Sequence, residues 1–112
     1  PPRSTLFPYT TLFRSLSSSS RAKVLDIMHR VRNKAYLGSG INKNAKFANK
    51  TGTLGIVLGD TGIVTMPNGK RYLAGIIVSR PFRDRRAKSF IKQVSRMVYG
   101  HINKSQVGSL PK

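Results

Sequence analysis

Apolar positions predict a helix near each end of the chain. Residues 22–36 carry apolar side chains at the spacing of an amphipathic helix, namely Val24, Leu25, Ile27, Met28, Val31 and Ala35. The Gly38-Ser39-Gly40 run is predicted to end this helix by supplying positive-φ residues. A second helix is predicted from Asp84, as its N-cap, to about His101. Its expected apolar face consists of Ala87, Phe90, Ile91, Val94, Met97 and Val98.

Strand-like segments lie between the two helices. Phe47–Thr53 and Leu54–Leu58 are apolar segments interrupted by glycines, and Ile63–Met66 is predicted as a short strand. Tyr72–Ser79 is rich enough in Ile, Val and Leu to be buried on both faces. The pattern predicts an α/β protein of the α+β type, in which the two helices pack on a three-stranded antiparallel meander.

Two turns are predicted within the meander. The Gly59-Asp60-Thr61-Gly62 run is rich in turn-forming residues. The Pro67-Asn68-Gly69-Lys70 run predicts a two-residue type I′ hairpin, because Asn and Gly tolerate the positive φ angles that this turn requires.

Residues 1–15, PPRSTLFPYTTLFRS, show neither helical nor strand periodicity. They can be back-translated, residue for residue, into the universal adapter oligonucleotide used in short-read sequencing. The alternative is a natural disordered arm. We expect coding sequence to begin at or after Leu16, with the upstream gene cut off. The predicted organisation is adapter-derived or disordered sequence over 1–20, a folded region over 21–103 and a loose tail over 104–112.

Basic residues outnumber acidic residues by 21 to 3, which gives a formal net charge of +18. This balance is typical of proteins that bind phosphate backbones, so a small basic nucleic-acid-binding protein is one hypothesis. The basic residues are spread over both helices and the loops, and no zinc-finger, RNP-like or basic-zipper pattern occurs. The sequence therefore favours a protein without a nucleic-acid partner.

Several other classes of site are excluded by composition. Cysteine is absent, so the chain has neither a disulfide framework nor a thiolate metal site. His29 and His101 have no carboxylate or cysteine at ligand spacing, so no metal site is predicted. No run of about 18 apolar residues predicts a membrane span.

The motif with the clearest chemistry is Lys50-Thr51-Gly52, which follows an apolar strand and precedes a glycine-rich segment. The surrounding blocks are Ala48–Thr53, Pro67–Tyr72 and Arg86–Ile91. Together they resemble the C-terminal end of the class A β-lactamase-like serine hydrolases, in particular those of the cyanobacterial type. The resemblance covers roughly residues 22–102. It implies that 21–103 is the C-terminal part of a β-lactamase/transpeptidase-like domain whose N-terminal portion is the missing partner.

The resemblance implies a role for each residue of the motif. Lys50 would supply positive charge to the pocket, and Thr51 would donate its hydroxyl to the substrate carboxylate. Gly52 leaves room for the acyl group along the strand edge. The backbone N–H of Thr53 would be one of two oxyanion-hole donors. The implied parent needs no metal or organic cofactor, acts on a β-lactam or related amide, and is exported to the periplasm or cell envelope.

The catalytic partners of this motif are missing from the sequence. Acyl transfer in this family needs a serine activated by a lysine, or by a glutamate acting through water, and the chain contains no glutamate. Ser89-Phe90-Ile91-Lys92 fits the Ser-x-x-Lys string, but it lies downstream of Lys50 in the last predicted helix. It is interpreted as a solvated helix face. The chain is therefore expected to be inactive alone.

Overall fold

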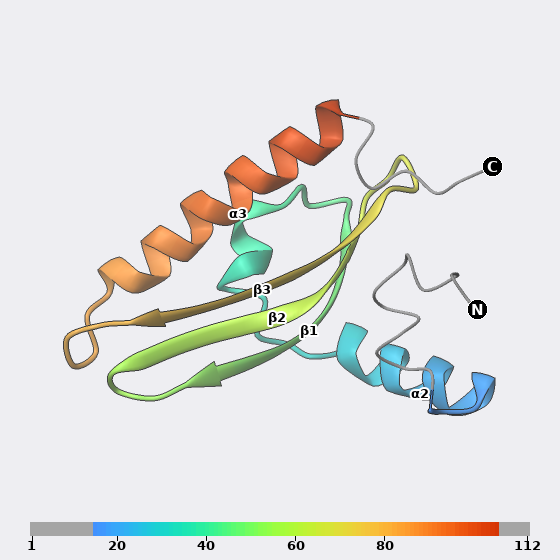
Figure 1. Cartoon of the computed structure of the whole chain (residues 1–112), viewed down its shortest axis with the longest axis horizontal. Helices are drawn as coiled ribbons and strands as arrows, with labels where there is room; N and C mark the ends of the chain where they lie inside the picture. Colours follow the sequence, from blue (N-terminus) through green and yellow to red (C-terminus); the bar gives the residue numbers. More distant parts are fainter. Residues whose placement is uncertain (1–14, 106–112) are drawn as a thin grey trace.

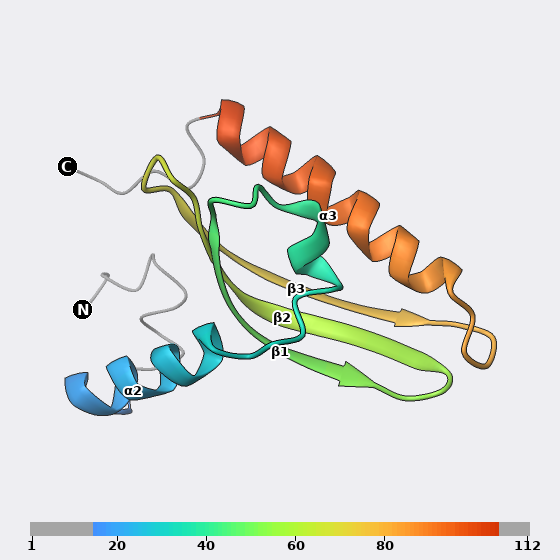
Figure 2. The same ribbon diagram turned by 180° about the vertical axis from the view of Figure 1, so that it is seen from behind.

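The computed structural model describes residues 15–105, which build a small antiparallel sheet with helices beside it (Figure 1). The elements in chain order are α2 (Ser18–His29), the 3₁₀ helix η2 (Leu37–Gly40), β1 (Lys46–Thr53), β2 (Val57–Thr65), β3 (Arg71–Ser79) and α3 (Arg86–Lys104). Helix α3 lies along one face of the sheet, and η2 packs against it (Figure 2). The α2 helix contacts β1.

The predicted three-stranded antiparallel meander is confirmed. The strand order is β1-β2-β3, and both neighbouring pairs are antiparallel. Thr51 pairs with Asp60, which in turn pairs with Ile76, so these three residues fix the register across the sheet. The hydrophobic core lies between the sheet and α3, with Leu58, Val64 and Ile91 as its most deeply buried aliphatic side chains.

The first helix differs from the prediction at both ends. It begins at Ser18, where the Ser17 side chain caps the N–H of Ser20, and it ends at His29 rather than at residue 36. None of its residues is fully buried. The Gly38-Ser39-Gly40 run does not end this helix, because it lies within η2 and neither glycine has a positive φ.

The predicted turn at Gly59-Asp60-Thr61-Gly62 is wrong, because these residues lie in the middle of β2. The chain instead reverses at residues 54–56, where the N–H of Leu54 donates to Val57 O at 2.8 Å. The segment predicted as a strand at Leu54–Leu58 is therefore a turn followed by the start of β2. The short strand predicted at Ile63–Met66 contains the end of β2.

The second hairpin is where the sequence places it, but it is not a type I′ turn. Gly69 has φ of 89°, whereas Asn68 is not among the positive-φ residues. The N–H of Gly69 donates to Met66 O at 2.9 Å, and Asn68 Oδ1 accepts from the N–H of Lys70 at 3.1 Å. Gly69 is therefore the only residue of this turn with a positive φ, a conformation that glycine adopts without steric strain.

Strand β3 is covered on one face only, contrary to the prediction. Tyr72, Ala74, Ile76 and Val78 pack against the core, whereas the side chain of Ile77 on the other face is 80% exposed. The strand is also an edge of the sheet in the described part of the chain.

Helix α3 begins after Arg85, so Asp84 is not its N-cap. Asp84 nevertheless accepts the N–H of Arg86 at 2.8 Å. The buried face also differs from the expected one and consists of Ala87, Ile91, Ser95, Tyr99 and Ile102. The apolar residues Phe90, Met97 and Val98, expected in the core, are 52%, 73% and 39% exposed. The helix ends at Lys104, three residues later than predicted.

The close packing of η2 on α3 depends on Gly40. A Cβ atom at this position would lie 2.5 Å from Lys92 O and 2.6 Å from Arg96 N, both of which are backbone atoms that cannot turn away. We predict that Gly40→Ala lowers the free energy of unfolding by about 1–3 kcal/mol through overpacking.

Gly100→Ala is the matched control for this prediction. A Cβ atom there would meet nothing within 4 Å, and the residue lies in α3, so alanine should raise stability by about 0.5–1 kcal/mol. Urea unfolding followed by circular dichroism at low micromolar concentration measures both. Equal effects of the two substitutions would contradict the packing argument.

Candidate functional site

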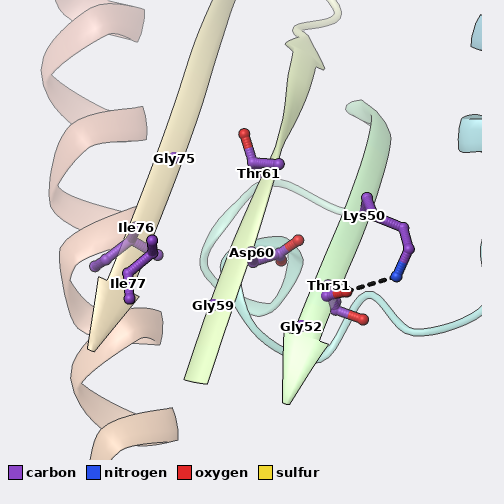
Figure 3. A pocket seen from close by; sticks show the side chains of 9 residues that line it. All are labelled: Lys50, Thr51, Gly52, Gly59, Asp60, Thr61, Gly75, Ile76 and Ile77. Atoms are coloured by element: carbon purple, nitrogen blue, oxygen red, sulfur yellow. Dashed lines mark hydrogen bonds between the residues drawn. The ribbon is translucent and has the colours of Figure 1, made fainter. Parts of the chain in front are cut away.

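A hollow of about 550 Å³ lies on the face of the sheet opposite α3, and each strand contributes three consecutive residues to it. These segments are Lys50–Gly52 of β1, Gly59–Thr61 of β2 and Gly75–Ile77 of β3, and they are paired directly across the sheet (Figure 3). The hollow exists because Gly52, Gly59 and Gly75 present no side chain to this face. The predicted site residues Lys50, Thr51 and Gly52 all line it.

The Lys50 side chain is exposed at the border of the hollow. Its Nζ donates to Thr51 O at 2.7 Å, as the dashed line in Figure 3 shows. Within residues 15–105 this ammonium has no carboxylate partner, because the two ion pairs of this region are Arg30–Asp26 and Arg86–Asp84. A cation without a carboxylate partner at the border of a hollow suits the binding of an anionic ligand.

In the part of the chain that the structure describes, β1 is an edge strand, so its alternate peptide groups point away from β2. Leu54 and Val57 exchange hydrogen bonds, so the adjacent Thr53–Leu58 pair is of the non-hydrogen-bonded kind. The same alternation places Thr51 O on the open edge, where Lys50 contacts it. The backbone N–H of Thr53 therefore points to that open edge, while its hydroxyl lies 2.9 Å from the Tyr36 hydroxyl.

A buried polar network lies behind this edge, and sequence reasoning did not identify it. Asn49 and Asp60 are 0% and 3% exposed. Asn49 Nδ2 donates to Asp60 Oδ1 at 3.1 Å and to Asn33 O at 3.0 Å, while Asp60 Oδ2 accepts the N–H of Leu37 at 3.0 Å. No short motif could have revealed the network, because its members are separated along the chain and meet only in the fold.

Lys34 completes the network from the open edge of β1. Its Nζ donates to Phe47 O and to Asn49 Oδ1, both at 2.6 Å, and to Met28 O at 3.2 Å. The ammonium thus binds the segment after α2 to the first half of β1. Among residues 15–105, Lys34 occupies this half of the edge, whereas no other segment bonds to the outward backbone groups from Lys50 to Thr53.

Burial sets the electrostatics of the network. Desolvation raises the pKa of Asp60 above 3.8, against the opposing effect of its hydrogen bonds from Asn49 and Leu37 and of the nearby Lys34 charge. Desolvation likewise lowers the pKa of Lys34 below 10.5, although Asp60 opposes this shift. In both groups the favourable interactions offset the desolvation of the charged form only in part.

The Ser-x-x-Lys string lies far from this hollow in the fold. Ser89 and Lys92 lie on α3, which packs against the core face of the sheet, whereas the hollow is on the opposite face. Among residues 15–105 no three His, Asp or Glu side chains gather at a possible metal site. Within this same part of the chain, no helix is long and apolar enough to cross a bilayer.

The model of the "Beta-lactamase enzyme family" matches residues 10–102. The chain belongs to this family. No curated protein sequence matches the chain.

Solved structures of β-lactamase-like proteins share the fold. PBP-A is 46% identical with a TM-score of 0.83, and the match covers 90% of this chain and 38% of that protein. A variant of PBP-A solved as an acyl-enzyme complex with penicillin G matches equally well. TLA-1 extended-spectrum β-lactamase is 24% identical with a TM-score of 0.77, covering 89% of this chain and 40% of that one. The chain thus spans about two fifths of the length of these proteins.

We predict that Asp60→Asn destabilises the protein by about 1–3 kcal/mol at neutral pH. Asp60 accepts one hydrogen bond on each oxygen, and an amide would place its N–H₂ group against Asn49 Nδ2 or the Leu37 N–H. Asp26→Asn is the matched control. The Asp26 carboxylate pairs with Arg30 on an exposed helix surface, so its loss should cost no more than about 0.5 kcal/mol. Urea unfolding of both variants checks the difference.

The stability difference between wild type and Asp60→Asn should also depend on pH. The folded-state pKa of Asp60 is raised above 3.8. The resulting contribution of Asp60 to the free energy of unfolding is therefore fully present below pH 3.8 and is lost as pH rises through the folded-state pKa. The advantage of the wild type over the variant should therefore shrink from acidic to neutral pH. Unfolding curves across this range measure it, and an advantage that grows with pH would contradict the raised pKa.

Proposed function

We propose that this chain is the C-terminal portion of a β-lactamase-like serine hydrolase and forms the carboxylate-binding and oxyanion side of its active site. In the parent, a serine on the missing portion attacks a β-lactam or related amide and forms an acyl-enzyme, which water then hydrolyses. The chain alone contributes binding groups without a nucleophile.

The observation that carries this proposal is the open half of the β1 edge. It combines the ammonium of Lys50, which has no carboxylate partner, with the outward backbone N–H of Thr53. The first would attract the substrate carboxylate, and the second would donate to the oxyanion. Thr51 and Gly52 lie between them, and both border the hollow. A substrate with its carboxylate near Lys50 and Thr51 and its carbonyl oxygen near the Thr53 N–H would use all four residues from Lys50 to Thr53.

The similarity to PBP-A supports the proposed chemistry. A protein that is 46% identical over nearly all of this chain forms an acyl-enzyme with penicillin G. The remaining three fifths of that protein have no counterpart here, and we propose that the equivalent portion of the parent carries the serine and the base. It would be the main partner of this chain. The parent would be exported to the periplasm or cell envelope and would need no metal or organic cofactor.

A chimera tests the proposal. Residues 22–102 replace the aligned segment of PBP-A, and the chimera is treated with a fluorescent penicillin. We expect covalent labelling of the chimera, and Lys50→Ala should slow the labelling by about 100-fold, as is typical when a preorganised electrostatic group is lost. The 112-residue chain by itself should not hydrolyse a chromogenic β-lactam.

Lys46→Ala is the matched control, because Lys46 is also an exposed lysine on β1 but lies at the other end of the strand. It should leave the labelling rate unchanged. Equal labelling of the Lys50→Ala and unsubstituted chimeras would refute the role of Lys50. Turnover of β-lactam by the chain alone would refute the missing nucleophile.

A further inference from the structure

Helix α3 carries a basic stripe beside its buried face. Lys88, Lys92 and Arg96 follow one another at four-residue intervals, which places them on one side of the helix about 6 Å apart along its axis. All three are exposed. The exposed apolar residues Phe90 and Met97 lie on the other side of the buried face, so the stripe is purely cationic.

No acidic side chain of the chain is available to neutralise this stripe. The chain has three acidic residues, and all of them are engaged elsewhere. Asp26 pairs with Arg30 at 3.1 Å, Asp84 pairs with Arg86 at 2.6 Å, and Asp60 is buried in the network behind β1. Like charges four residues apart on a helix repel one another. No acidic side chain in residues 15–105 relieves this repulsion, and an anionic partner would.

The stripe borders a concave surface. A cleft of about 350 Å³ between α3 and η2 is lined by Lys88, Lys92, Ser89, Ser39 and Ala35. Gly40, next to Ser39, lies against the backbone of Lys92 and Arg96 and so holds η2 close to the helix. A flat bilayer surface cannot enter a cleft between two helices, whereas a single extended chain can lie along it.

We propose that this stripe and cleft bind a single phosphodiester-linked chain through its backbone phosphates. The two lysines and Arg96 contact successive phosphates, and the Ser89 hydroxyl donates a further hydrogen bond from the cleft. Among the described residues no aromatic side chain lines the cleft, so bases or other substituents on the bound phosphodiester are not recognised. The surface lies on the opposite side of the sheet from the hollow at Lys50 and is independent of it.

The proposal is tested with a fluorescein-labelled single-stranded oligonucleotide of twelve abasic sites and with twelve-residue oligo(dT). Both should bind the 112-residue chain with the same affinity within about threefold, because only phosphates are contacted. The triple variant Lys88→Gln, Lys92→Gln, Arg96→Gln should bind at least about tenfold more weakly at low salt. Its slope of log affinity against log salt should be smaller by about 2, since each phosphate contact contributes about 0.7 for a single strand.

The control variant removes the same charge elsewhere. Lys23→Gln, Lys43→Gln, Arg32→Gln changes two lysines and one arginine that are exposed and lie outside α3. It should weaken binding less than threefold. Circular dichroism should show that both triple variants remain folded, because only exposed side chains are changed.

Three outcomes would overturn the proposal. Equal weakening by the two triple variants would mean that net charge alone attracts the oligomer. Much tighter binding of oligo(dT) than of the abasic oligomer would mean that bases are recognised. Binding to vesicles of phosphatidylglycerol, without binding to either oligomer, would mean that the partner is a membrane surface.

Discussion

The open edge of β1 is the constraint on which the site depends, and the Lys34 ammonium determines how much of it stays open. Lys34 occupies Phe47 O and the Asn49 side chain at 2.6 Å, so the first half of the edge is closed by a residue of the same chain. Within residues 15–105, no other segment bonds to the outward backbone groups of the second half, where Thr51 O accepts from the adjacent Lys50 side chain. An extended ligand can therefore align with the strand at only one place.

The same network fixes the position of Lys50 from behind. Asn49 precedes Lys50 and is held by Asp60 and Asn33, so the strand cannot slide or rotate at this point without breaking buried hydrogen bonds. Leaving a buried polar group unpaired costs more than a typical hydrogen bond contributes, which makes the network rigid. A flexible lysine on a fixed strand can follow a ligand while its backbone neighbours stay in place.

The sequence predicted the meander and the final helix, because these depend on local patterns. It did not predict the middle of β2, where the run from Gly59 to Gly62 has the composition of a turn. Gly59 instead leaves the outer face of the sheet bare and helps to create the hollow, whereas a Cβ atom at Gly62 would clash with the backbone of Ala48 and Asn49. Glycine in a turn and glycine beneath a ligand site look alike in one sequence. The polar network was also invisible, since Lys34 and Asp60 meet only through tertiary packing.

The α3 helix shows why counting apolar residues identified only part of the buried face, namely Ala87 and Ile91. Its buried stripe includes Ser95, whose hydroxyl donates to Leu37 O at 2.6 Å, and Tyr99, whereas Phe90 and Met97 are largely exposed. A serine at a helix–helix contact allows η2 to approach closely, and that approach also forms the cleft beside Lys92. The sheet thus separates two surfaces of different chemistry. The hollow on one side offers a single cation with outward backbone donors, and the stripe on the other offers a row of cations without them. A compact carboxylate suits the first surface and a repeating anion suits the second.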